Sequence, residues 1–193
     1  MAFQRGRSKS SRSSSRRPIP GNGDSENLDQ PRLLSPEKLE TRARNVLLHQ
    51  LARSAKSTSQ LRKILEQREI PSEIAEKVLE RFTEVGLIDD AAYAETIVNS
   101  RRNYKGLAKS AIKRELNEKG VPAPFIEVAD ESITAEDDFE AAKDLASRRI
   151  RQMSALTREV RERRLAGYLG RKGYPSSVVF AAIKFAESQI ETV

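Results

Sequence analysis

The chain has 193 residues, of which 37% are hydrophobic, 33% are charged and 5% are aromatic, with no tryptophan and no cysteine. This composition excludes disulfide frameworks and thiolate metal sites, and it favours several small aliphatic cores over one large core. The formal net charge of +7 favours an anionic partner such as nucleic acid.

Residues 1–34 differ in composition from the rest of the chain. They contain mainly Arg, Ser, Gly and Pro, with few aliphatic side chains. Such a segment cannot bury enough apolar surface to offset the entropy lost on ordering, so we expect a disordered basic tail. Two roles for the tail stay open, a solubilising extension and an accessory electrostatic contact to nucleic acid.

A short pattern of apolar residues, which we call the repeated phrase, occurs three times in the remaining chain, at offsets of 51 and then 53 residues. Each copy ends in an aliphatic or aromatic residue followed by proline, at Ile70-Pro71, Val121-Pro122 and Tyr174-Pro175. Proline cannot continue a helix but suits the first turn of the next one, so each copy predicts a helix, a turn and a second helix. This period lies near the upper end of the range for helical repeat arrays.

The residue before each apolar–proline pair distinguishes the three turns. It is glycine in two copies, Gly120 and Gly173, but glutamate in the first, Glu69. Glycine adopts the left-handed backbone of a helix C-cap at the lowest cost. We therefore expect the first turn to be the least ideal of the three.

Apolar residues at helical spacing, interrupted by capping signals, predict three helices in each copy. The first repeat spans residues 35–86 and begins at Ser35-Pro36, the second spans 87–134 and opens at Asp89-Asp90, and the third spans 135–193. No segment sustains the period-two alternation of a strand. We predict an all-α fold of three tandem three-helix repeats in an elongated array, preceded by the tail.

Residues suited to catalysis or to metal binding are scarce. His49 is the single histidine, and its place between apolar neighbours in a helix favours a core or boundary role. The acid pairs Asp89-Asp90 and Asp137-Asp138 occur where helices begin, and capping explains them. No glycine-rich nucleotide-binding motif occurs. We therefore expect no enzyme activity, no cofactor and no metal.

Basic residues at helical spacing carry the strongest functional signal. Lys105, Lys109 and Lys113 recur every four residues, directly after Arg101 and Arg102. A solvated helix face is the alternative for any single residue, but two neighbouring basic faces favour a polyanionic partner. The predicted partner-binding residues are Arg101, Arg102, Lys105, Lys109, Lys113, Arg148, Arg149, Arg161, Arg164, Arg171 and Lys172.

Several short motifs are similar to those of a known protein family. They are Gly86-Leu87-Ile88-Asp89-Asp90-Ala91-Ala92-Tyr93-Ala94, Ser100-Arg101-Arg102, Lys105-Gly106, Glu115-Leu116-x-x-Lys119-Gly120-Val121 and Leu169-Gly170-Arg171-Lys172-Gly173-Tyr174. Over residues 42–186 the chain resembles the RecX family of bacterial recombination regulators. Residues 1–34 have no counterpart in the pattern of that family.

The resemblance implies an elongated, curved molecule of tandem three-helix repeats that lies in the helical groove of the RecA–DNA filament. It also implies a regulatory protein that inhibits the recombinase, ATPase and coprotease activities of RecA, and so affects DNA repair and the SOS response. The basic residues above would then contact the RecA filament on DNA.

A second hypothesis stays open, that of a non-catalytic helical-repeat protein acting directly on DNA or RNA. Sequence-specific recognition is not expected, because Tyr93, Tyr168 and Tyr174 fall at core or turn positions and leave few platforms for base stacking. We expect a cytoplasmic monomer without membrane contact. No apolar run approaches the length of a bilayer span, and the first seven residues lack the apolar segment of a secretory signal.

Overall fold

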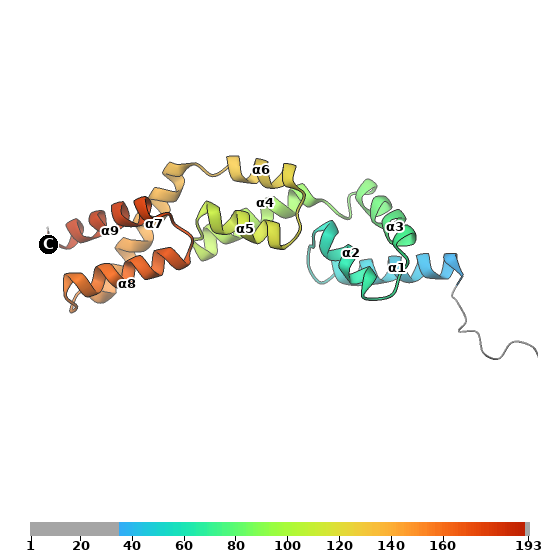
Figure 1. Ribbon diagram of the computed structural model, residues 1–193, viewed down its shortest axis with the longest axis horizontal. Helices are drawn as coiled ribbons and strands as arrows, with labels where there is room; N and C mark the ends of the chain where they lie inside the picture. Colours follow the sequence, from blue (N-terminus) through green and yellow to red (C-terminus); the bar gives the residue numbers. More distant parts are fainter. Residues whose placement is uncertain (1–34, 192–193) are drawn as a thin grey trace, which may run out of the picture. The chain divides into compact units, whose positions relative to one another are not determined.

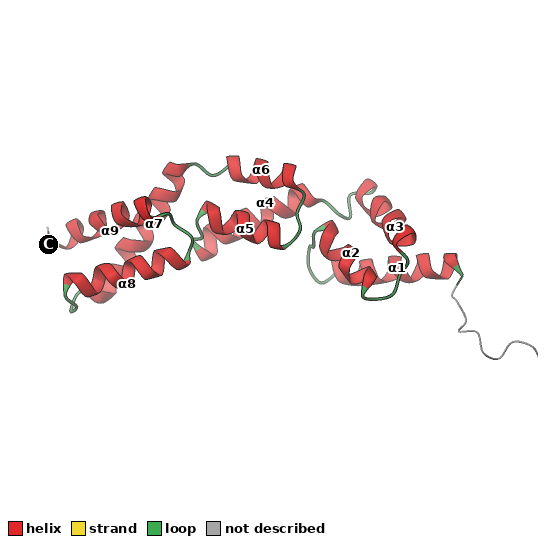
Figure 2. Cartoon of the chain, in the orientation of Figure 1, coloured by secondary structure: helices red, strands yellow, loops and turns green. Residues whose placement is uncertain are grey.

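The computed structural model describes residues 35–191, and every regular element in this range is a helix (Figures 1 and 2). The α-helices are α1 (Pro36–Leu51), α2 (Thr58–Glu66), α3 (Ser72–Glu84), α4 (Asp90–Ser100), α5 (Lys109–Glu118), α6 (Ala123–Glu131), α7 (Ala135–Ile150), α8 (Arg158–Arg171) and α9 (Ser176–Glu191). A π-helix, Arg101–Lys105, follows α4, and a 3₁₀-helix, Arg151–Met153, follows α7. The predicted all-α class is confirmed, and the tail prediction for 1–34 lies outside the described residues.

Each group of three helices encloses a core of its own. Nine residues of the repeated phrase supply the centres of these cores, and each is 5% exposed or less: Leu61, Leu65, Ile70, Ile112, Leu116, Val121, Leu165, Leu169 and Tyr174. Burying one such aliphatic side chain stabilises the fold by about 1.5 to 3 kcal/mol. The predicted division of the apolar residues among small aliphatic cores is therefore what holds the repeats together.

The predicted helix starts have side-chain caps. Ser35 accepts a hydrogen bond from the backbone of Lys38, and Asp89 Oδ1 accepts one from Ala92 N at 2.9 Å. Thr134 and Asp137 form a reciprocal capping box at the start of α7. These caps satisfy amides that have no partner inside the helix. Among the described helices, none combines the length and the apolarity needed to cross a bilayer.

The turn between the second and third helices has left-handed backbone in all three repeats, with φ of 57° at Glu69, 67° at Gly120 and 89° at Gly173. Two of these turns pack against the preceding repeat. A Cβ atom at Gly120 would lie 2.4 Å from Ser59 Oγ, and one at Gly173 would lie 2.7 Å from Ala111 Cβ. The Glu69 side chain is exposed, so this residue bears only the conformational cost of about 1 to 2 kcal/mol.

Consecutive repeats are joined by the same buried contact, used twice. Asp90, in the first helix of the second repeat, accepts a hydrogen bond from the backbone amide of Thr58 at 2.9 Å. Asp138, in the first helix of the third repeat, accepts one from the amide of Lys109 at 3.2 Å. Thr58 and Lys109 are the first residues of α2 and α5. Each carboxylate therefore meets a helix N-terminus, where the unpaired amides and the helix dipole stabilise negative charge.

Candidate functional site

Two predicted arginines of the second repeat are held in internal ion pairs. Arg101 Nε and Nη2 donate to the Glu115 carboxylate at 2.7 and 2.5 Å, and Arg102 Nη1 donates to Asp138. The two arginine side chains are only 18% and 17% exposed. The Arg101 guanidinium holds the pKa of Glu115 below its usual value, chiefly through these hydrogen bonds. Both guanidinium groups are thus engaged in holding helices together.

The predicted lysines of α5 converge on one carboxylate. The Nζ atoms of Lys109 and Lys113 lie 3.5 and 3.3 Å from Asp130 Oδ2, so the two side chains do share a face, as their spacing predicts. This carboxylate from α6 offsets part of their combined charge. Lys105 is exposed in the π-helix, and its carbonyl oxygen accepts a hydrogen bond from Lys172 Nζ.

In the third repeat Arg161 is also held internally. Its Nε and Nη2 donate to the Glu187 carboxylate at 3.0 and 2.5 Å, and its Nη1 donates to the carbonyl of Leu156 at 2.8 Å. Glu187 is only 2% exposed, so the pair ties α8 to α9 inside the repeat. By contrast, Arg148 Nη2 lies 3.9 Å from Asp144 Oδ2, and both side chains are strongly exposed. Such an exposed ion pair contributes little to stability.

The remaining predicted arginines meet in a hollow of about 480 Å³ between the end of α7 and the middle of α8. We call this hollow the arginine groove, and its main polar lining residues are Arg149, Gln152, Arg163, Arg164, Tyr168 and Arg171. No acidic side chain lines it. Within residues 35–191, no carboxylate lies at ion-pair distance from Arg163, Arg164 or Arg171.

The Tyr168 ring organises the cations around this groove. The guanidinium carbon of Arg149 lies 5.6 Å from the ring centroid, and Lys172 Nζ lies 5.2 Å from it. Arg149 Nη1 also donates to Gln152 Oε1 at 3.1 Å. Cation–π contacts and this hydrogen bond restrain two otherwise mobile side chains. Several positive charges held together without a carboxylate suit a ligand that carries phosphate or carboxylate groups.

Seven of the eleven predicted basic residues therefore fall into two classes. Arg149, Arg164 and Arg171 line the arginine groove and Lys172 lies over the Tyr168 ring, whereas Arg101, Arg102 and Arg161 are tied in internal ion pairs.

Arg163, Gln152 and the contacts of Tyr168 with cations were not predicted from the sequence. One signal for Arg163 was available, because Arg163, Gly167 and Arg171 recur every four residues on one helical face. A Cβ atom at Gly167 would lie 3.4 Å from Arg171 Nη1, an ordinary van der Waals contact.

The described residues offer little for catalysis. No group of three or more His, Cys, Asp or Glu side chains among them is placed to hold a metal ion.

The core or boundary role expected for His49 is wrong, because this residue is exposed on the side of α1 away from Ala43 and Leu47. Burial raises the pKa of Tyr174 to about 12, and its hydroxyl donates to the carbonyl of Gly106.

Comparison with known proteins matches all three repeats. Family models described as the first, second and third three-helix domains of RecX match residues 43–82, 89–129 and 136–183. A protein of Streptomyces coelicolor named "Regulatory protein RecX" is 44% identical over 144 residues, which cover 75% of this chain and 77% of that protein. The chain belongs to the RecX family. It is accordingly a regulatory protein of a non-catalytic family that modulates RecA.

Other RecX proteins agree in sequence and in fold. A "Regulatory protein RecX" of Thermobifida fusca is 38% identical over 150 residues, covering 78% of this chain and 81% of that protein. A crystal structure of regulatory protein RecX superposes with a TM-score of 0.65 at 29% identity and covers 78% of this chain and 73% of that one. RecX from Lactobacillus salivarius, with a TM-score of 0.69, 19% identity and coverage of 79% and 99%, shows the same fold.

Proposed function

We propose that this chain binds the RecA filament on DNA and inhibits the recombinase, ATPase and coprotease activities of RecA, with consequences for DNA repair and the SOS response. Membership of the RecX family supports RecA as the partner. The observation that carries the finer proposal is the arginine groove, where four guanidinium groups line one hollow without a carboxylate. The phosphates of filament DNA are the matching ligand.

The proposed interface uses the predicted basic residues unequally. Arg149, Arg164, Arg171 and Lys172, with Arg163 added, are the residues that we place against the phosphates. A guanidinium already held by a carboxylate has fewer donors left, so Arg101, Arg102 and Arg161 support the interface by fixing the helices. Lys105, Lys109, Lys113 and Arg148 are candidates for weaker outer contacts. Neutralising several phosphates at once releases counterions and gives affinity without sequence preference.

We further propose that the chain acts in the cytoplasm, where it meets RecA on DNA, and that it acts as a monomer. Each of the three cores is closed by helices of the same chain, which supports the monomer. The elongated, curved form implied by the family remains part of this proposal.

The test is the ATPase rate of RecA preassembled on single-stranded DNA and titrated with the full chain. We expect the rate to fall when the chain is present at well below one copy per RecA, because a filament regulator acts on assembled filaments. An unchanged rate at equimolar chain would overturn the proposal.

A second candidate function is direct binding of DNA or RNA without RecA, and the same arginine groove favours it. The measurement is the anisotropy of labelled single-stranded DNA in the absence of RecA over a range of salt concentrations. Each phosphate contact to a single strand contributes about −0.7 to the slope of log affinity against log salt, so three to five contacts give a slope of about −2 to −3.5. A flat salt response would remove this candidate.

A further inference from the structure

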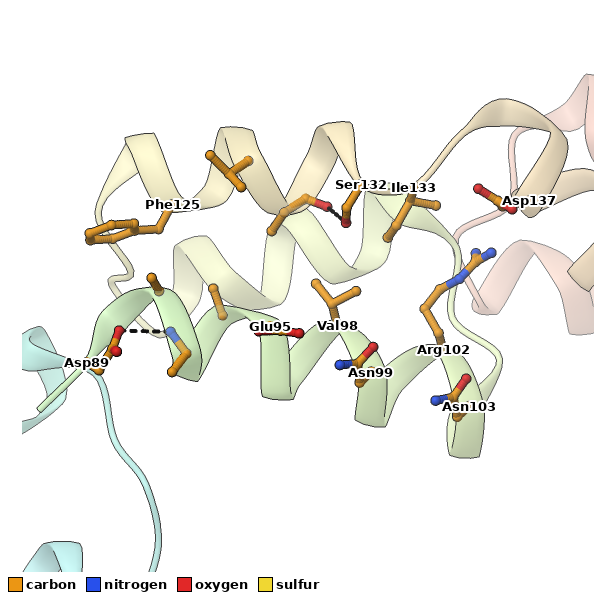
Figure 3. Close-up of a pocket in the computed structure, with 15 residues that line it drawn as sticks. Asp89, Glu95, Val98, Asn99, Arg102, Asn103, Phe125, Ser132, Ile133 and Asp137 are labelled. Carbon is orange, nitrogen blue, oxygen red and sulfur yellow. Dashed lines mark hydrogen bonds between the residues drawn. The ribbon is translucent and has the colours of Figure 1, made fainter. Parts of the chain in front are cut away.

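A second hollow has the opposite chemistry to the arginine groove. It has a volume of about 770 Å³ and lies between α4 and α6, with side chains of both helices facing into it (Figure 3). Val98 and several alanines of α4 face Phe125, Val128 and Ile133 across it. We call this hollow the apolar groove.

The helix α6, which lines the apolar groove, is the shortest third helix of the three repeats. It has 9 residues, whereas α3 has 13 and α9 has 16. Phe125 is 37% exposed and Val128 is 68% exposed. At the position that corresponds to Val128, the first repeat has Lys77 and the third has Ala181. A large exposed apolar side chain at this point is thus a feature of the second repeat alone, and core packing does not explain it.

Carboxylates dominate the charge around the apolar groove. Asp89, Glu95 and Asp137 line it together with one basic residue, Arg102 (Figure 3). The Arg102 guanidinium is paired with Asp138. Hydrogen bonds from Thr134 hold the pKa of Asp137 below its usual value. In a chain of net charge +7, this face repels phosphates and attracts cations. DNA is therefore excluded as its occupant.

An occupant must satisfy both the apolar floor and the acidic edge. The groove follows α4 and the π-helix from Asp89 to Asn103, a length on the order of 20 Å at the rise of a helix. An amphipathic helix of about four turns would span it, with apolar anchors in the hollow and Lys or Arg beside them. Asn99 and Asn103 add amide groups for polar contacts at the far end (Figure 3).

We propose that the apolar groove docks an amphipathic protein helix that presents apolar anchors flanked by basic residues, and that RecA supplies this helix. The identity of the donor rests on the proposed function, whereas the chemistry of the groove does not. The chain then has two separate binding faces, one for phosphates at α7 and α8 and one for protein at α4 and α6.

The first experiment tests the groove itself, with a fluorescein-labelled 14-residue amphipathic peptide of Leu and Lys as the probe. The groove variant is Glu95→Lys/Val128→Ser, and the control is Glu73→Lys/Phe180→Ser, which makes the same charge reversal and replaces an exposed apolar side chain by serine outside the groove. We expect the groove variant to bind the peptide at least about tenfold more weakly than wild type, and the control to stay within about twofold.

Amide shifts in a ¹⁵N-labelled chain locate the peptide. We expect changes along residues 89–103 and 123–133. Equal peptide affinity of the groove variant and wild type, or shifts confined to α7 and α8, would overturn docking in the apolar groove. Both changes lie at exposed positions, so the melting temperatures of the variants verify that they remain folded.

The second experiment tests RecA as the donor, using the same two variants in the RecA ATPase titration. Weaker inhibition by the groove variant than by the control supports RecA. Lost peptide binding with unchanged inhibition would overturn RecA as the donor. If wild type binds the peptide in the groove but does not inhibit RecA, the proposed function fails while docking in the groove stands.

Discussion

The second repeat has seven Lys and Arg residues and the third has eleven, and the two repeats use them in different ways. In the second repeat Arg101, Arg102, Lys109 and Lys113 each lie within ion-pair distance of a carboxylate. In the third repeat the arginines of the arginine groove face a hollow that no acid lines. Positive charge in a sequence is therefore not the same as positive charge available to a partner.

The positions of the acidic residues cause this difference. Glu115, Asp130 and Asp138 come from α5, α6 and α7 and reach the basic residues of the second repeat. In the third repeat no acid occurs from residue 163 to residue 186. Cations of the arginine groove thus stay free of neutralising partners and repel each other moderately until an anion binds.

The largest predicted effect concerns the one arginine of α8 that is tied inside the third repeat. Glu187→Gln should lower the free energy of unfolding by about 3 kcal/mol, because it removes the charge of a carboxylate that is 2% exposed and that accepts two hydrogen bonds from the Arg161 guanidinium. Urea unfolding followed by circular dichroism measures this loss. The control is Glu162→Gln, whose exposed pair with Arg158 should contribute less than about 1 kcal/mol. Equal losses in the two variants would contradict a structural role for Arg161.

The second prediction concerns the charges of the arginine groove. Arg163→Gln/Arg164→Gln/Arg171→Gln should weaken binding to single-stranded DNA by at least about tenfold, or about 1.4 kcal/mol, because three phosphate contacts are lost. Anisotropy of labelled DNA gives the affinity.

The matched control for this triple variant is Arg53→Gln/Lys63→Gln/Lys184→Gln, which removes the same charge from scattered exposed positions. Similar losses in the two triple variants would mean that net charge, rather than the arginine groove, determines the affinity. Melting temperatures close to wild type would show that neither variant affects folding.

The third prediction uses pH to test the ion pair between Glu115 and Arg101 in the second repeat. The pKa of Glu115 is lowered in the folded state by its pair with Arg101. At pH values between the lowered and the ordinary pKa, the unfolded chain therefore binds more protons than the folded chain. The resulting stabilisation is complete above the ordinary glutamate pKa of 4.5 and is lost as pH falls through the lowered value. Glu115→Gln should therefore lower the melting temperature at pH 7 more than at pH 3. An equal reduction at both pH values would show that the ion pair is not stabilising.

The smallest predicted effect concerns the lysines of α5. Lys109→Gln/Lys113→Gln should change DNA affinity by less than about threefold, because Asp130 already offsets part of their charge. Asp130→Asn should strengthen binding by about twofold, since it releases both ammonium groups. The same anisotropy assay measures both variants. A tenfold loss in the lysine variant would place the main DNA contact on the second repeat and reverse the comparison.

Much of the fold could be predicted because its determinants are local. The repeated phrase marks the buried positions of the second helices and the turns that follow, and the starts at Ser35 and Asp89 follow from capping chemistry. The unusual turn at Glu69 was also visible in the sequence. The reason for it was not visible in the sequence, because the need for glycine at Gly120 and Gly173 comes partly from contact with the preceding repeat.

The candidate site was less predictable, because whether a basic side chain is free to bind a partner depends on carboxylates from other helices. The spacing of Lys109 and Lys113 gives their shared face, but Asp130 comes from the next helix. Tyr168 was assigned to a core or turn position, and it does pack partly buried against the core of the third repeat, but its ring also contacts Arg149 and Lys172, which the sequence did not indicate. Periodicity describes one helix at a time, and these partners meet only when helices pack.

The most direct test of the account compares inhibition of the RecA ATPase by wild type, by the triple arginine-groove variant and by the scattered triple variant, on the same preassembled filaments. We predict inhibition by wild type and by the scattered variant at similar concentrations, and at least about tenfold more protein for the arginine-groove variant. Equal inhibition by all three proteins would contradict the assignment of the arginine groove as the surface that contacts filament DNA.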